Sequence, residues 1–196
     1  MNYTLNQWQE DFYSKMKSLS VLCAHRRFGK TFLSVYALAK AAWERDEPDG
    51  VFVYVTFSCA AATNAWRLFA QMFETVTGVK KSNAARRITL PNGSEIWVLT
   101  ASAVELAVDR DLVLNGAALD EMPLFPSIRP SVYDKLLRAD WVLCTGTGGI
   151  LNGPFAKLYR KADASADGHA QRFSAKDTGF DESYSEYTGE GKHADS

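Results

Sequence analysis

Apolar residues recur along the chain in two patterns, and the two patterns predict different elements. Four apolar residues recur at helical spacing within residues 5–16, which predicts a helix there with Thr4 as its N-cap. Continuous apolar runs predict strands at residues 19–23, 51–57, 112–119 and 141–144. Runs without alternating polar residues suit strands that are buried on both faces of a parallel sheet, so the pattern predicts an α/β fold.

Helical patterns follow the first two predicted strands. Residues 31–45 are apolar on several faces, as expected for a helix that packs beside a central sheet. A second helix is marked by Trp66, Phe69, Phe73 and Val76. Residues 88–90 and 95–100 flank a Pro-Asn-Gly-Ser turn, which predicts a β-hairpin. Together these elements predict a mostly parallel central sheet flanked by helices on both faces.

Charge is distributed unevenly along the chain. The 196 residues carry a net charge of −1, which argues against a protein that wraps DNA through bulk charge. Residues 176–196 hold two lysines and six acids, whereas residues 1–175 hold 20 basic and 17 acidic residues. We therefore expect a folded domain over residues 1–180 and an acidic, disordered tail over residues 181–196.

One basic stretch and three cysteines each leave a choice open. The basic residues that bracket a loop before the hairpin are Lys80, Lys81, Arg86 and Arg87. They are consistent either with a solvated loop or with contacts to a nucleic-acid backbone. The cysteines occur singly and without metal-binding spacing, which fits a reducing, intracellular setting. Cys23 and Cys144 lie in apolar runs, which favours buried thiols at these two positions. No apolar run is long enough to cross a bilayer, so we expect no membrane association.

The most informative stretch is Val-Leu-Cys-Ala-His-Arg-Arg-Phe-Gly-Lys-Thr at residues 21–31. A strand, a loop containing glycine, Gly-Lys-Thr and then a helix form the layout of a nucleotide phosphate-binding loop. Lys30 would reach the β- and γ-phosphate oxygens, and the Thr31 hydroxyl would ligate Mg²⁺. Ala24 stands where the common motif has its first glycine, and a coincidental helix start is the alternative interpretation.

The strand predicted at residues 112–119 leads directly into Asp120 and Glu121. A strand that ends in two carboxylates is what such an ATPase needs opposite its loop: Asp120 would hold Mg²⁺ and Glu121 would act as general base on water. The last predicted strand leads into Thr145, Gly146 and Thr147. These residues would sense the γ-phosphate and pass on its loss, although a glycine-rich turn with structural threonines is a competing interpretation.

With these motifs the chain resembles the ATPase domain of the large terminase subunit of tailed bacteriophages, the motor that pumps DNA into proheads. The resemblance runs from about residue 5 to about residue 180. It rests on residues 5–9, the arginine-bearing loop, the strand at 51–57, the hairpin, residues 110–121, Arg129-Pro130 and Thr145-Gly146-Thr147. It implies an ASCE-type P-loop NTPase.

The resemblance also implies residue roles. Gln9 would read the adenine edge, although a solvent-facing glutamine is the alternative. Arg26 matches an arginine that contacts the phosphates and is tied to hydrolysis. Arg110 matches a finger that reaches a neighbouring subunit's nucleotide, but Asp111 follows it where the family usually has glycine. The expected catalytic set is Arg26, Lys30, Arg110 and Glu121. The expected ATP-binding set is Gln9, His25, Arg26, Arg27, Phe28, Gly29, Lys30, Thr31, Thr145, Gly146 and Thr147, with Thr31 and Asp120 on Mg²⁺.

The function that the resemblance implies is Mg²⁺-dependent ATP hydrolysis that drives double-stranded DNA into a prohead. The implied partners are DNA, the portal protein, the small terminase subunit and further copies in a ring, a pentamer in the family. The implied setting is the cytoplasm of the infected bacterium, with transient docking on the prohead and absence from the mature virion. The family's nuclease domain has no counterpart here, so we expect no DNA cleavage. A helicase-like or repair ATPase, and a docking subunit without turnover, are the alternatives.

Overall fold

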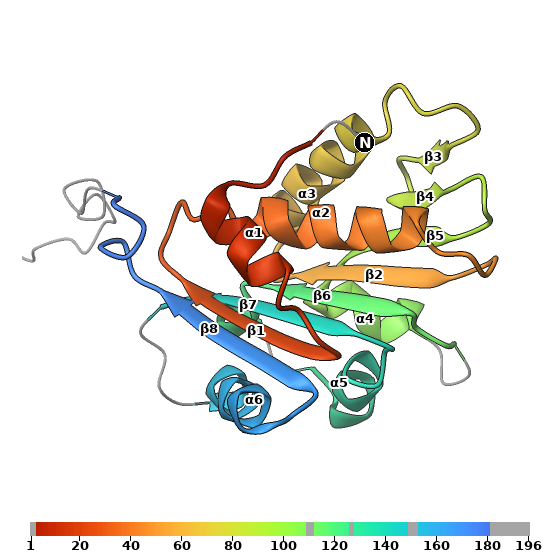
Figure 1. Ribbon diagram of the computed structural model, residues 1–196. Coiled ribbons are helices and arrows are strands. Elements are labelled where there is room, and N and C mark those ends of the chain that lie inside the picture. Colours follow the sequence, from red (N-terminus) through yellow and green to blue (C-terminus); the bar gives the residue numbers. More distant parts are fainter. Residues whose placement is uncertain (1–2, 109–111, 126–127, 149–152, 181–196) are drawn as a thin grey trace, which may run out of the picture.

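The computed structural model describes residues 3–108, 112–125, 128–148 and 153–180. Within them one eight-stranded sheet runs through the molecule, with helices packed on both of its faces (Figure 1). The strands are β1 (Leu19–Ala24), β2 (Val51–Thr56), β3 (Lys80–Ser82), β4 (Arg87–Thr89), β5 (Glu95–Thr100), β6 (Gly116–Asp120), β7 (Val142–Thr147) and β8 (Gly168–Phe173). The predicted α/β fold is confirmed.

The strand order is β3-β4-β5-β2-β6-β7-β1-β8. From β5 to β8 every neighbouring pair is parallel, whereas β3 and β4 join as an antiparallel extension. The predicted hairpin is thus confirmed as β4 and β5. β7 separates β1, which precedes the phosphate-loop motif, from β6, which precedes the acidic pair. This strand order is compatible with the ASCE-type fold that the resemblance implies.

Two layers of helices cover the sheet. The helices are α1 (Gln7–Tyr13), α2 (Lys30–Trp43), α3 (Cys59–Met72), α4 (Ala101–Ala107), α5 (Pro130–Leu136) and α6 (Gly153–Ala164), with a 3-10 turn, η1 (Met122–Leu124). α1, α2 and α3 lie on one face, and α4, α5 and α6 lie on the other (Figure 1). Apolar clusters fill both interfaces, as expected because β1, β2 and β6 carry almost unbroken buried runs. None of the described helices has the length and apolar character that a membrane span requires.

Several boundaries differ from the sequence predictions. The N-cap of α1 is Asn6 and the prediction of Thr4 is wrong, because Asn6 and Gln9 bond each other's backbone in a capping box. That helix also ends at Tyr13, short of the predicted residue 16. The strand predicted at residues 112–119 begins only at Gly116. The residues before it belong to a loop, in which Val113 is exposed.

Candidate functional site

The loop between β1 and α2 has a backbone shape that its sequence dictates. Gly29 has φ +89°, in the left-handed region that favours glycine. A Cβ atom on Gly29 would lie 2.4 Å from Gln9 Nε2, so a larger residue would displace Gln9 as well as strain the backbone. No side chain of the described residues caps α2. Its first amides and the positive end of its dipole therefore adjoin the loop, which makes this helix start a place for an anion.

Lys30 is a buried cation at the start of α2. Only 6% of the residue is exposed. Its Nζ donates to the backbone oxygens of Ala24 and His25, at 3.2 Å each, and lies 3.0 Å from Glu121 Oε1. These contacts use all three donors of the ammonium group, which is how a buried charge remains tolerable. The phosphate-loop motif and the acidic pair, far apart in sequence, are thereby joined directly.

Asp120 is buried at the end of β6 and accepts hydrogen bonds from three hydroxyl groups. Its Oδ2 accepts from Thr31 Oγ1 at 2.7 Å and from Tyr54 Oη at 2.5 Å. Its Oδ1 accepts from Thr145 Oγ1 at 2.6 Å. These donors come from α2, β2 and β7, so three neighbouring elements fix one carboxylate. Thr31 and Asp120, the two predicted Mg²⁺ ligands, are thus in direct contact, and their predicted binding of Mg²⁺ remains a prediction.

Glu121 lies just beyond the strand, in a left-handed backbone conformation with φ +54°. Its carboxylate accepts from the backbone N–H of Thr147 at 3.1 Å and from Thr147 Oγ1 at 2.8 and 2.9 Å. Its own N–H donates to Thr145 Oγ1 at 3.2 Å. A non-glycine residue with positive φ is uncommon and costs of order 1–3 kcal/mol. The surrounding bonds offset that cost and aim the carboxylate back towards Lys30.

Gln9 is buried, and its amide contacts the phosphate-loop backbone. The Nε2 atom donates to the backbone oxygens of Phe28 at 3.2 Å and Gly29 at 3.3 Å, while Oε1 accepts from Asn6 N–H at 3.0 Å. The alternative of a solvent-facing glutamine is therefore wrong. In the structure Gln9 braces the loop, and its predicted contact with adenine remains a prediction.

The other predicted residues of the loop occupy two environments. Arg26 and Arg27 are exposed at its tip. Phe28 is buried and stacks on Phe173 with ring centroids 5.0 Å apart. His25 contacts a segment that follows β8: its Nε2 lies 2.8 Å from Thr178 Oγ1, and its ring lies 5.4 Å from that of Phe180. The loop is thus supported from beneath by aromatic packing, with its two arginines outermost.

The structure gives no support to the predicted roles of two further residues. Gly146 is packed so closely that a Cβ atom would lie 2.8 Å from Phe155 and 2.9 Å from Pro123. The packing alone explains the glycine, so the structure gives it no link to nucleotide. Arg110 lies outside the described residues, and its predicted role remains a prediction. Among the described residues there is no cluster of three or more His, Cys, Asp or Glu side chains that could hold a metal ion.

Sequence reasoning missed Tyr54 as part of the site. Its ring is fully buried on β2 and packs edge-on against Phe69, with centroids 5.9 Å apart. Burial, together with the adjacent Asp120 carboxylate, raises the pKa of Tyr54 well above its usual value, so its hydroxyl stays protonated as a donor. Tyrosine is common in buried strands and its partner lies 66 residues away, so no local signal would have found the pair.

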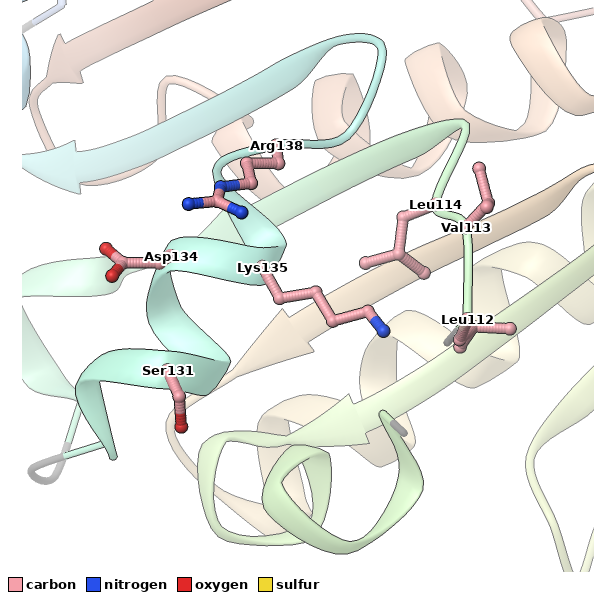
Figure 2. A pocket seen from close by; sticks show the side chains of 7 residues that line it. All are labelled: Leu112, Val113, Leu114, Ser131, Asp134, Lys135 and Arg138. Carbon is pink, nitrogen blue, oxygen red and sulfur yellow. The ribbon is translucent and has the colours of Figure 1, made fainter. Parts of the chain in front are cut away.

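A separate hollow lies at the opposite end of the sheet. It has a volume of about 530 Å³ and is lined by Leu112, Val113, Leu114, Ser131, Asp134, Lys135 and Arg138. Figure 2 shows Lys135 reaching towards the leucine side, while Asp134 points the other way. Its residues come from the loop before β6 and from α5 and its end, whereas the loop motif and the acidic pair lie at the carboxyl ends of β1 and β6.

No protein-family model matches the sequence, and comparison of the sequence with curated proteins finds no match. The structure, in contrast, resembles solved ATPases. A Sulfolobus solfataricus SWI2/SNF2 ATPase core in complex with dsDNA matches with a TM-score of 0.59 and 11% identity, over 92% of this chain and 46% of that one. The class of fold is therefore the P-loop ATPase fold.

Within that class, large terminases of several phages match with higher scores. The HK97 bacteriophage large terminase matches with a TM-score of 0.68 and 18% identity, over 86% of this chain and 39% of its own. The Thermus phage P74-26 large terminase ATPase domain gives 0.69 and 16%, over 89% and 83%. The large terminase of another thermophilic bacteriophage, in complex with ADP, gives 0.68 and 15%, over 95% and 51%. The chain has a large-terminase-like ATPase fold.

Proposed function

We propose that this chain is the ATPase of a viral DNA-packaging motor, which hydrolyses ATP with Mg²⁺ and translocates double-stranded DNA into a prohead. One observation carries the proposal: Lys30 and Thr31 at the start of α2 meet Asp120 and Glu121 at the end of β6 in a single hydrogen-bonded cluster. The fold places that cluster beside the uncapped start of α2. A cation, a hydroxyl and two carboxylates in this arrangement suit phosphoryl transfer to water, a reaction that enzymes catalyse by positioning the reactants and stabilising charge.

The residues present fit a magnesium ion. Thr31 and Asp120 offer a hydroxyl and a carboxylate, the oxygen ligands that Mg²⁺ prefers, and phosphate oxygens and waters would complete the set. Bound there, the ion would neutralise charge on the β- and γ-phosphates. Arg26, at the exposed tip of the loop, would add a second positive charge to the phosphates.

The contact between Lys30 and Glu121 suggests how nucleotide would prepare the base. Phosphate oxygens would compete with Glu121 for the Lys30 ammonium, because a triphosphate is a stronger partner than one carboxylate. Glu121 would still be held by the Thr147 hydroxyl and amide. Freed from Lys30 but kept in place, its carboxylate would orient the attacking water and accept its proton.

DNA contact is supported by basic residues at the β3–β4 edge of the sheet. Arg67 on α3 and Lys80 and Lys81 on β3 are exposed. This end of the molecule is extended by the β3–β4 hairpin, which is bound to α3 through Arg86 and Thr63 at 3.1 Å. A fixed cationic edge of this kind fits the phosphate backbone of a duplex. Portal protein, small terminase subunit and further copies in a ring are the other proposed partners, and the bacterial cytoplasm with transient prohead docking is the proposed location.

The DNA contact has its own test. Changing Lys80 and Lys81 together to Gln should weaken duplex binding and lower the slope of log affinity against log salt by about 1–2. Lys157 and Lys161 lie on α6, which packs against β8 at the opposite edge of the sheet, and changing both to Gln is the matched control. Equal losses in both variants would remove the hairpin as the DNA face.

Hydrolysis is tested by phosphate release from ATP with and without Mg²⁺, at rising protein concentration. Glu121→Gln keeps the shape of the side chain but removes the base, so turnover should fall by about 100-fold or more while ATP binding remains. Glu74→Gln, an exposed change just beyond the end of α3, is the control. Turnover that grows faster than linearly with concentration would support shared sites in a ring. Tight ATP binding without turnover in the unaltered protein would favour a docking subunit instead.

A further inference from the structure

Tyr54 belongs to the cluster around Asp120, yet it lies outside both the loop motif and the acidic motif. It lies on β2, two residues before the end of that strand. In the parallel pairing of β2 with β6, Tyr54 is opposite Ala118 and Thr56 is opposite Asp120. Since side chains alternate along a strand, Tyr54, Ala118 and Asp120 share the face of the sheet that α2 and α3 cover. The phenol thus approaches the carboxylate from the buried side.

The hydroxyl of Tyr54 occupies a defined acceptor position. An ionised carboxylate offers about four acceptor positions. On Asp120, Tyr54 and Thr31 occupy Oδ2 and Thr145 occupies one position on Oδ1. Because Oδ2 is shared by Tyr54 and Thr31, the direction in which Thr31 donates depends on where Tyr54 holds that oxygen.

Tyr54 is more rigid than Thr31, the other donor to Oδ2. Its ring is fully buried and packs against Phe69, so the position of Oη is set by the core. Thr31, by contrast, is a partly buried residue in the first turn of α2. The buried Tyr54 hydroxyl therefore fixes the position of Asp120 Oδ2. The position of Oδ2 in turn sets the direction in which the more exposed Thr31 hydroxyl donates.

We propose that Tyr54 is a positioning residue: it fixes Asp120 Oδ2 so that the Thr31 hydroxyl donates to it and turns its lone pairs outwards, towards the place of the nucleotide's Mg²⁺. The inference rests on the proposed function, because it concerns the same magnesium–nucleotide site. Tyr54 itself touches neither ion nor nucleotide, and acts only through Asp120 and Thr31.

The test compares nucleotide affinity with and without the metal. A fluorescent ATP analogue is titrated into the protein in Mg²⁺ and in EDTA, and the ratio of the two dissociation constants measures metal-dependent binding. In Tyr54→Phe the ring and its packing remain and one hydroxyl is lost. We expect the ratio to shrink by about fivefold or more while the affinity in EDTA stays within about twofold. Tyr36→Phe, a partly buried phenol on α2 with no hydrogen bond to Asp120 in the structure, is the matched control.

A purely structural role predicts a different result. In that case Tyr54→Phe would lower the melting temperature but leave the ratio unchanged, and the inference would be overturned. A double-mutant cycle with Asp120→Asn gives a second reading: if Tyr54 acts through Asp120, Tyr54→Phe has no further effect on the ratio in that background. Additive effects would also overturn it.

Two remaining outcomes are separated by design. If Tyr54→Phe does not fold, Phe69→Leu is the second variant, because it keeps the Tyr54 hydroxyl but loosens the packing of the Tyr54 ring. The ratio of the two dissociation constants should then shrink in part. An unchanged ratio in Phe69→Leu would overturn the inference. If the unaltered protein binds the analogue neither in Mg²⁺ nor in EDTA, the proposed function itself fails and the role of Tyr54 fails with it.

Discussion

Among the described residues, charged side chains are buried at the carboxyl ends of the parallel strands but not at their amino ends. At the carboxyl ends of β1 and β6, Lys30 and Asp120 are 6% and 2% exposed. Lys30 pairs with Glu121, and Asp120 accepts a hydrogen bond from Thr31. At the amino ends, polar contacts such as Asn115 to Asp140, at 2.9 Å, lie at the surface. A buried charge is costly unless fully paired, so a protein keeps one mainly where it has a use. The burial of charged side chains therefore marks the carboxyl end as the candidate functional site.

The hollow at the amino ends of the strands is lined by charged residues, but none of them is buried. The hollow of about 530 Å³ in Figure 2 lies at the amino end, where Val113 is 71% exposed. Clefts outside the carboxyl ends of parallel strands are the usual ligand sites of open α/β sheets. The two places therefore differ in buried charge, and the proposed function assigns the chemistry to the cluster in which the charges are buried and paired.

The largest expected effect comes from removing the buried cation. Lys30→Ala should weaken ATP binding by about 100-fold, or ~3 kcal/mol, because a charge-assisted contact to phosphate is lost. Equilibrium binding of a fluorescent ATP analogue measures it. Lys40→Ala removes a lysine from the same helix that pairs at the surface with Glu44, at 2.8 Å, and should change affinity by less than about twofold. Similar losses in both variants would contradict the contrast between buried and exposed charge.

An intermediate effect is expected at Thr147. Thr147→Val removes the hydroxyl that bonds both oxygens of Glu121 but keeps the amide that bonds one of them. The turnover rate should fall about 10-fold, or ~1.4 kcal/mol, with ATP affinity within about twofold, since only the base loses a support. Steady-state phosphate release and analogue binding separate the two quantities. Thr89→Val, on β4, is the control, and a parallel loss of affinity in Thr147→Val would show that the threonine serves binding instead.

The smallest effect is expected at the amino end. Arg138→Ala opens one wall of the hollow in Figure 2, far from the buried cluster. Both ATP affinity and turnover of the protein alone should stay within about twofold, because exposed charges contribute little. The same two assays apply. A tenfold change in ATP affinity or in turnover would contradict this expectation and would show that the hollow is coupled to the nucleotide site.

The fold and the main cluster could be predicted because each rests on a local signal. Unbroken apolar runs specify parallel strands. Asp-Glu directly follows such a run, and Gly-Lys-Thr follows another after residues 24–28. β8 escapes prediction, because it is an edge strand whose His169, Gln171 and Arg172 give it no apolar run. The cap of α1 escapes as well, because the reciprocal bond between Asn6 and Gln9 depends on geometry that composition does not reveal.

The contacts within the site were the least predictable part. Tyr54 and Asp120 meet because β2 and β6 are neighbours in the sheet, a pairing that no local pattern encodes. The same holds for Lys30 and Glu121, which meet although they follow β1 and β6, two strands with β7 between them. Local patterns identify which groups can do the chemistry, and topology decides which of them touch.

The contact of His25 with Thr178 and Phe180 has a mechanical consequence. The chain leaves β8 at Phe173 and soon returns to the phosphate loop, bonding His25 through Thr178 and packing its ring against it through Phe180. Tension applied to the chain at Phe180 would therefore load the loop before it loads the sheet, whose parallel pairing of β1 with β8 resists shear along six residue pairs. The loop that we propose binds phosphate is thus also the first mechanical anchor of the segment that ends at Phe180.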